Sequence, residues 1–303
     1  MITRRRMLTL AASLAALTAA GPALAQDNVP AKLKVLATFS ILGDLVRNVG
    51  GDRVEVATLV GPNSDAHVYA PAPADAKKVA DAKVVFTNGL GYEGWMSRLV
   101  KASGTKAPVA VASKGVKERK AQGGHGHGGA DPHAWQSVAN AKVYVANIRD
   151  ALVAADPAGK AAYEANAAAY LGKLDALDQD VKAAVAAIPA DRRKIISTHD
   201  AFGYFQQAYG VEFIAPQGVS TEAEPSARDV ARIITQVKKQ KIPAVFLENI
   251  TDARLMERIA QESGARIGGK LYSDALTDEK GDAPTYLDMM RHNIKQISAA
   301  LMS

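Results

Sequence analysis

The stretch that decides the fold is "AGKAAYEANAAAYLGKLDALDQDVKAAVAAI", residues 158–188. It consists almost entirely of strong helix formers, and the prolines at positions 157 and 189 bound it on both sides. A helix of this length spans roughly 40 Å, which is more than one small layer needs. Two arrangements are open: the helix bridges two lobes, or it packs along a single domain. The length favours the bridge.

Short apolar runs alternate with amphipathic segments on both sides of this helix. We expect strands at 33–39, 54–60, 82–89, 193–198, 211–217, 244–249 and around 266–272. Helical patterns lie between them, at 40–51, 73–81, 225–242 and 252–265, and a terminal helix is expected at 285–302. Ser40 is a candidate N-cap, and Pro225 suits a first helical turn. Strands that alternate with helices predict an α/β fold with parallel sheets, here as two α/β lobes.

The chain therefore divides into four parts. Residues 1–25 are a predicted signal peptide, and residues 26–136 an N-terminal α/β lobe. Residues 137–189 hold the connecting helices, including the long one, and residues 190–303 form a C-terminal α/β lobe.

The first 25 residues have the pattern of an export signal. Three arginines at positions 4–6 precede an apolar run, and Ala23-Leu24-Ala25 is a small-x-small cleavage site. The arginines fit both the general secretory route and the twin-arginine route, and the choice stays open. The chain has no cysteine after the cleavage site to carry a lipid. We expect cleavage after Ala25 and a soluble periplasmic protein without a lipid anchor.

The amino-acid composition excludes several kinds of site. The 303 residues contain no cysteine, so disulfides, thiolate metal ligands and thiol nucleophiles are excluded. The formal net charge is +6, and half of it comes from the three arginines of the export signal. No basic cluster with interleaved aromatic residues is present, so we expect no nucleic-acid partner.

Four residues are placed where ligand groups of α/β proteins collect. His67, His199 and Asp274 each follow a predicted strand, and His133 lies between a glycine-rich stretch and a helix. In open α/β sheets, ligands bind beyond the carboxyl ends of strands. A single histidine at such a place can equally well hydrogen-bond a loop backbone. Their joint placement favours a metal site.

Two further histidines, His125 and His127, stand in "QGGHGHGGA". A segment this rich in glycine cannot pack a core. One interpretation is a surface loop without a role. The other is an auxiliary loop that captures metal near the site.

The chain resembles the zinc- and manganese-binding solute receptors of bacterial ABC importers, the cluster A-I family. The resemblance covers nearly all of the sequence after the signal. It is carried by an ordered set of motifs: "FSILGDLVRNVGGDRVEVATLVGPNSDAHVYAP" (39–71), "NGLGYEGW" (88–95), "DPHAWQSVANA" (131–141), "STHDAFGYF" (197–205), "STEAEPSARDVA" (220–231) and "LYSDALTDEKGDAPTYLDMMRHN" (271–293).

This resemblance implies two lobes bridged by a long helix, with the metal in the cleft between them. By motif, the metal ligands are His67, His133, His199 and Asp274. Three imidazoles and one carboxylate suit tetrahedral zinc, whereas manganese favours more oxygen ligands. The family often has glutamate at the third position in manganese receptors and histidine in zinc receptors. His199 therefore favours Zn²⁺ as the transported ion, with Mn²⁺ as the alternative.

The sequence thus predicts a periplasmic zinc-binding receptor that delivers Zn²⁺ to an inner-membrane ABC importer. Its expected partners are the permease with its ATPase, and a periplasmic zinc metallochaperone as donor; we expect a monomer. Alternatives are a manganese or mixed-metal receptor, a secreted zinc hydrolase and an adhesin. Four protein ligands leave no position for a catalytic water, and no HExxH or GxSxG motif occurs, so we expect no enzyme.

Other polar residues of the motifs are expected to support the ligands or the fold. We assign structural or ligand-orienting roles to Glu93, Glu222, Glu224 and Glu248. The sequence does not indicate which of them partners which histidine. His292, in the terminal helix, is expected to be a packing or surface residue.

Overall fold

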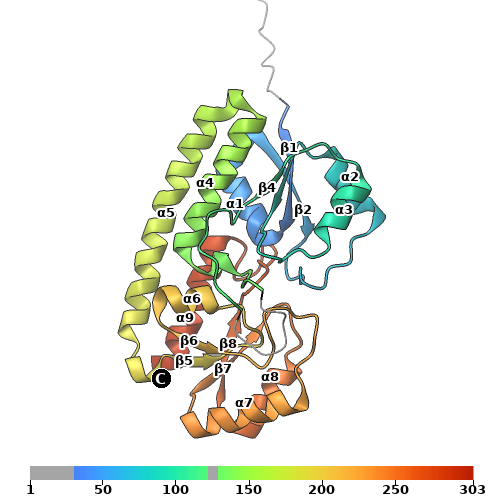
Figure 1. The fold of residues 1–303 in the computed structure, drawn as a ribbon. Helices are drawn as coiled ribbons and strands as arrows, with labels where there is room; N and C mark the ends of the chain where they lie inside the picture. Colours follow the sequence, from blue (N-terminus) through green and yellow to red (C-terminus); the bar gives the residue numbers. More distant parts are fainter. Residues whose placement is uncertain (1–30, 122–128, 303) are drawn as a thin grey trace, which may run out of the picture. The chain divides into compact units, whose positions relative to one another are not determined.

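The computed structural model describes residues 31–121 and 129–302 (Figure 1). The export signal predicted at 1–25 and the loop histidines His125 and His127 lie outside the described residues.

The first lobe contains β1 (Leu33–Phe39), α1 (Ser40–Gly50), β2 (Val54–Val60), α2 (Pro73–Asp81), β3 (Val84–Thr87), α3 (Met96–Ser103) and β4 (Val109–Val111). The second contains β5 (Lys194–Ile196), α6 (Gly203–Tyr209), β6 (Glu212–Ile214), α7 (Ala227–Gln240), β7 (Ala244–Glu248), α8 (Arg254–Ser263), β8 (Arg266–Leu271) and α9 (Tyr286–Met302). In the sequence, α4 (Val138–Ala155) and α5 (Lys160–Ala187) come between the two lobes, and α4 packs against α1, β3 and β4 of the first.

The two sheets have the same topology. Their strand orders are β2-β1-β3-β4 and β6-β5-β7-β8, and every described strand pair is parallel. In each lobe a helix connects each strand to the next, as a parallel sheet requires. The prediction of two parallel α/β lobes is confirmed. Because all strands of a sheet point the same way, the loops after them gather at one edge.

Helix α5 bridges the two lobes, as its length predicts. It packs against α1 and α4 of the first half and against α6 and α9 of the second (Figure 1). Its buried face includes Tyr163, Tyr170, Leu174 and Val181. These side chains belong to a hydrophobic core that continues from the first sheet to α9, whereas α7 and α8 pack around a separate small core. The alternative of a helix confined to one domain is therefore wrong.

Several local expectations need correction. Helices α3 and α6 and strand β4 were not predicted, because each has only three to eight residues, too few for a periodic pattern. Ser40 is the first residue of α1 rather than its N-cap, and its hydroxyl accepts a hydrogen bond from the Leu276 backbone N–H in the other lobe. Pro225 precedes the cap of α7, which is Ser226.

Residues Lys32–Ser303 form one compact unit. Among the described residues, no helix is both long and apolar enough to span a membrane. The lobe boundaries at 136/137 and 189/190 stay predictions.

Candidate metal centre

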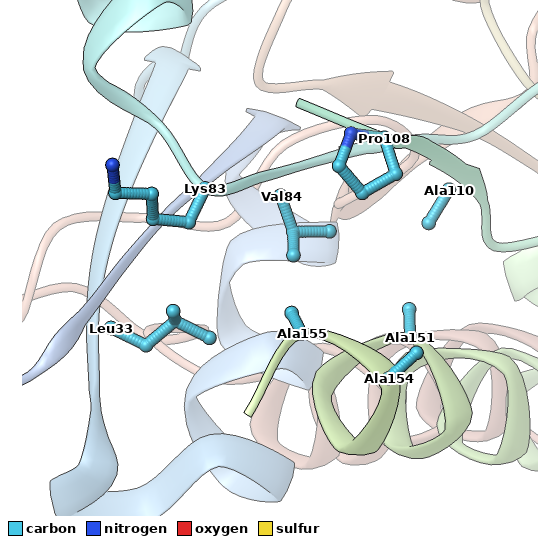
Figure 2. Close-up of a pocket in the computed structure, with 8 residues that line it drawn as sticks. All are labelled: Leu33, Lys83, Val84, Pro108, Ala110, Ala151, Ala154 and Ala155. Atoms are coloured by element: carbon cyan, nitrogen blue, oxygen red, sulfur yellow. The ribbon is translucent and has the colours of Figure 1, made fainter. Parts of the chain in front are cut away.

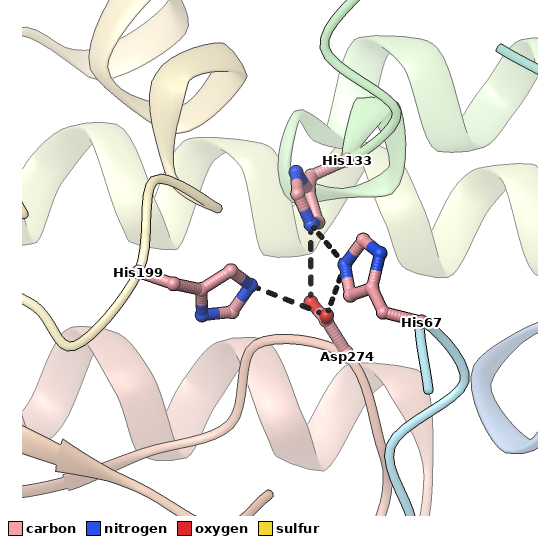
Figure 3. A group of neighbouring side chains, drawn as sticks. All are labelled: His67, His133, His199 and Asp274. Carbon is pink, nitrogen blue, oxygen red and sulfur yellow. Dashed lines mark hydrogen bonds and ion pairs between the residues drawn. The ribbon is translucent and has the colours of Figure 1, made fainter. Parts of the chain in front are cut away.

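The structure brings the four candidate ligands together, from both lobes (Figure 3). His67 stands in the loop after β2, and His133 lies directly before a short 3-10 turn that leads to α4. His199 follows β5 and Asp274 follows β8 in the second lobe. One potential ligand atom from each lies within 4.8 Å of the others. All four side chains are buried; His67 is 8% exposed and the other three 0%.

The spacing of these atoms suits a small cation. Nε2 of His67 lies 3.2 Å from Nε2 of His133 and 3.1 Å from Oδ2 of Asp274. Asp274 is 3.6 Å from His133 through Oδ1 and 3.3 Å from His199 Nε2 through Oδ2. Ligands placed ~2.0 Å from a tetrahedral zinc are about 3.3 Å apart. The four distances between these atoms, 3.1 to 3.6 Å, are close to that value.

Unsatisfied polar atoms mark the same centre. His199 Nε2 and both carboxylate oxygens of Asp274 are buried and have no hydrogen-bond partner among the described residues. Within the described part of the chain these atoms face one another, in ion-pair contacts of 3.1 to 3.6 Å between Asp274 and the three Nε2 atoms, and an ion that they all contact would satisfy them together. The donor set therefore fits a divalent metal.

Two of the histidines are presented by the same local structure. In "DAH" (65–67) and "DPH" (131–133), an aspartate accepts the backbone N–H of the histidine two residues later. The distances are 2.8 Å from His67 N to Asp65 Oδ1 and 3.0 Å from His133 N to Asp131 Oδ1. This is an Asx turn, which Asp favours through its short side chain. The repeated D-x-H spacing is a sequence signal that our reading missed.

Buried carboxylates also fix two of the imidazole rings. His133 Nδ1 lies 2.9 Å from Asp131 Oδ1, and His199 Nδ1 lies 2.6 Å from Glu248 Oε2. With Nδ1–H donating to the carboxylate, Nε2 keeps its lone pair and points it at the centre. Asp131 is held in turn by Arg119, whose Nη1 is 2.7 Å away.

Glu248 organises the ligands of the second lobe. Its Oε1 accepts the backbone N–H groups of Thr198 and His199, at 2.8 and 3.1 Å. Its Oε2 accepts the hydroxyl of Ser273, the residue before Asp274, at 2.8 Å. One carboxylate therefore positions both His199 and the segment that carries Asp274.

The charges of the site divide its histidines. Burial opposes charge on His133, but the carboxylates of Asp274 and Asp131 outweigh it and raise its pKa to about 9. Burial also opposes charge on His199, but the carboxylates of Glu248 and Asp274 outweigh it and raise its pKa well above 6.5. For His67, burial dominates and lowers the pKa. Asp274 is buried, yet the neighbouring histidines hold its pKa well below 3.8.

The remaining predicted residues lie outside this group. Glu93 is half-buried and accepts hydrogen bonds from the Thr38 hydroxyl and from two backbone N–H groups, so it supports the loop before α3. Glu222 and Glu224 are exposed. His292 packs its ring on Tyr272 and bonds a backbone carbonyl, as a packing residue would.

A cavity lies at the opposite edge of the first sheet (Figure 2). It has a volume of about 570 Å³ and is lined mostly by apolar side chains, among them Leu33 and Val84 at the first positions of β1 and β3. It contains no candidate metal ligand.

Fold and site together define a class: two-lobed α/β binding proteins with a buried metal centre between the lobes. Comparison with known proteins specifies the family. The family described as the periplasmic component A of the zinc-uptake complex matches residues 35–300. The chain belongs to this family of metal-binding substrate-binding proteins of ABC importers.

Three similar proteins carry names with different metals. The manganese ABC transporter substrate-binding lipoprotein PsaA of Streptococcus pneumoniae is 35% identical, over 89% of each chain. The iron-binding protein YfeA of Yersinia pestis is 34% identical, over 91% of this chain and 89% of its own. The periplasmic zinc-binding protein TroA of Treponema pallidum superposes with a TM-score of 0.84 at 31% identity, over 89% of this chain and 99% of that one.

Proposed function

We propose that this protein is a periplasmic receptor that binds one Zn²⁺ at His67, His133, His199 and Asp274 and delivers it to an ABC importer. The observation that carries this proposal is the buried group of three imidazoles and one carboxylate with unsatisfied ligand atoms. Here the ion is cargo, and both lobes contribute ligands to hold it.

The choice of zinc rests on the donor set. Imidazole nitrogen suits zinc, while carboxylate, carbonyl and water oxygens suit manganese. Three of the four ligands are nitrogens, and four of the distances between ligand atoms, 3.1 to 3.6 Å, are close to the separation in a tetrahedral zinc shell. TroA, which superposes on this chain, is named a zinc-binding protein.

A manganese receptor is the second candidate, and one observation favours it. Both oxygens of Asp274 lack hydrogen bonds, so the carboxylate is free to bind an ion through both and raise the coordination number. PsaA is named for manganese and YfeA for iron.

Thermal melting with each metal decides between the two candidates. Ligand binding stabilises the native state by about 4 kcal/mol when free ligand exceeds Kd a thousandfold. At matched free concentrations, Zn²⁺ should raise the Tm of the metal-free protein more than Mn²⁺ does. A native mass measurement of the purified protein, together with metal analysis, should give one zinc per chain. An equal or larger shift with Mn²⁺ would favour the manganese receptor.

The wider role follows from the same proposal. We infer a binding protein rather than an enzyme, because four protein ligands fill a tetrahedral shell and leave no water to activate. The partners are a permease with its ATPase; a zinc metallochaperone as donor stays a prediction from the sequence, as does the monomeric state. The form without a lipid anchor also stays a prediction from the sequence, and PsaA is named a lipoprotein.

A further inference from the structure

Among the three histidines, His67 is held differently. No hydrogen bond to its ring Nδ1 is present among the described residues, whereas His133 and His199 each have a buried carboxylate at that atom. His67 is also the only one of the four candidate ligands with measurable exposure. Its ring packs edge-on against Tyr92, with centroids 4.7 Å apart, and its hydrogen bonds outside the centre are made by the backbone of its loop.

That loop is held by Asp65, which contacts both lobes at once. Oδ1 of Asp65 accepts the His67 backbone N–H at 2.8 Å. Oδ2 accepts the hydroxyl of Thr221, from the second lobe, at 2.5 Å. A hydrogen bond to a carboxylate is about twice as strong as a neutral one. The carboxylate thus links the backbone of a metal ligand to the opposite lobe.

The contact continues on the side of the second lobe. The Gln217 side-chain amide donates to the backbone carbonyls of Thr221 and Ala223, at 3.2 and 2.9 Å. Gln217 is buried and forms a parallel backbone bridge with His199. A continuous path of short contacts therefore runs from His67 through Asp65, Thr221 and Gln217 to His199.

A second tie fixes the start of the same loop. Asn63 donates its backbone N–H to the Leu276 carbonyl at 2.8 Å, and its side chain accepts from the Asn249 amide at 3.1 Å. This tie does not involve Thr221. Loss of the Thr221 hydroxyl should therefore free the part of the loop that carries His67 while the lobes stay connected.

From these contacts we propose that Asp65 is a positioning residue for the ligand His67, and that its bond to Thr221 sets how fast metal leaves. This inference rests on the proposed function, because it concerns release of the same ion. An ion held by four ligands departs after one ligand moves away. His67 is the one histidine ligand whose Nδ1 has no carboxylate partner among the described residues, and the Asp65–Thr221 bond opposes its withdrawal.

The test measures zinc dissociation from the loaded full-length protein in stopped flow, at chelator concentrations where the rate no longer depends on chelator. Thr221→Val should raise the dissociation rate roughly tenfold, the factor expected for one lost charge-assisted bond, with the association rate within about twofold. Thr221→Ser keeps a hydroxyl and should behave as wild type. Thr235→Val is the matched control, since within the described ranges the Thr235 hydroxyl bonds only a carbonyl of its own helix, that of Ala231.

A double variant identifies the ligand through which the contact acts. In a His67→Ala background, Thr221→Val should leave the dissociation rate unchanged. A rate for Thr221→Val equal to that of Thr235→Val, or an effect that persists without His67, overturns this inference alone. A wild-type protein that holds no zinc overturns the proposed function and this inference with it.

Discussion

His67 and His199 both follow strands and both face the same centre, but the protein holds them in different ways. His199 is fully buried, and its ring and its backbone N–H both contact Glu248. His67 is held through its backbone by Asp65, and its ring has no carboxylate at Nδ1. Their pKa values move in opposite directions, up for His199 and down for His67.

The difference shows how a transport site can combine retention with release. A ring fixed by a buried carboxylate keeps one tautomer and one orientation, so it binds metal with little reorganisation. The His67 ring has an edge-on contact with Tyr92 but no carboxylate at Nδ1, so it can leave the centre when its loop moves. We infer that the second lobe and His133 give the site its affinity, and that His67 gives it a path for release.

The largest expected effect comes from removing a fixed ligand. His199→Ala deletes an imidazole at the centre and leaves Glu248 as a buried carboxylate without its ring partner. Loss of a ligand-orienting group costs 10–100-fold in metal affinity, and loss of the ligand itself should exceed about 100-fold. Chelator competition measures the affinity, with His292→Ala as the control. If the two variants bind zinc alike, the ligand assignment is wrong.

Proton competition should give the next largest effect. Metal binds only neutral imidazole, and His133 of the metal-free protein has a pKa of about 9. For each proton displaced, zinc affinity should rise about tenfold per pH unit between pH 7 and 9. Titration calorimetry in buffers of different ionisation enthalpy measures the protons released. An affinity that is flat above pH 7 would show that this histidine titrates near its ordinary value.

The same shift predicts the stability of the metal-free protein. The folded-state pKa of His133 lies above the unfolded value of about 6.5. The stabilisation from its protonation is therefore complete below pH 6.5 and is lost as the pH rises through about 9. The Tm of the metal-free protein should fall across this window, and the Tm of the zinc-loaded protein should fall less.

A smaller loss is expected at the carboxylate that distinguishes the two histidines. Glu248→Gln replaces one carboxylate oxygen by an NH2 group. This group cannot accept the Nδ1–H of His199, so the orientation and the tautomer of the ring are no longer fixed. Zinc affinity should fall about 10–100-fold. Glu262→Gln is the matched control, since Glu262 is exposed on α8 and pairs with Arg258. If Glu248→Gln and Glu262→Gln bind zinc equally tightly, the carboxylate does not fix the His199 ring for metal binding, and His199 and His67 do not differ in this way.

The outline of the fold could be predicted from the sequence, and the supports of the site could not. Strands at 33–39 and 54–60 coincide with β1 and β2, because each is a long apolar run with clear ends. Glu248 was singled out as a supporting residue, but its partner depends on how β5 and β7 pair, which no local pattern encodes. Asp65 could have been found from its D-x-H turn. Its contact with Thr221 joins residues 156 positions apart and needs the fold.

The smallest expected effect on affinity is at the histidines outside the described residues. The four-residue group already supplies a tetrahedral shell without His125 and His127. Replacing both by alanine should therefore leave the chelator-competition affinity for one zinc nearly unchanged. Ordering a glycine-rich segment around a metal costs backbone entropy, so these histidines should act, if they bind, by holding zinc weakly and speeding its capture. The rate of zinc loading at a low free zinc concentration is therefore compared between the wild type and the double variant. If the double variant no longer binds one zinc tightly, His125 or His127 is a ligand of the site. His67 would then not be the ligand that is held least firmly.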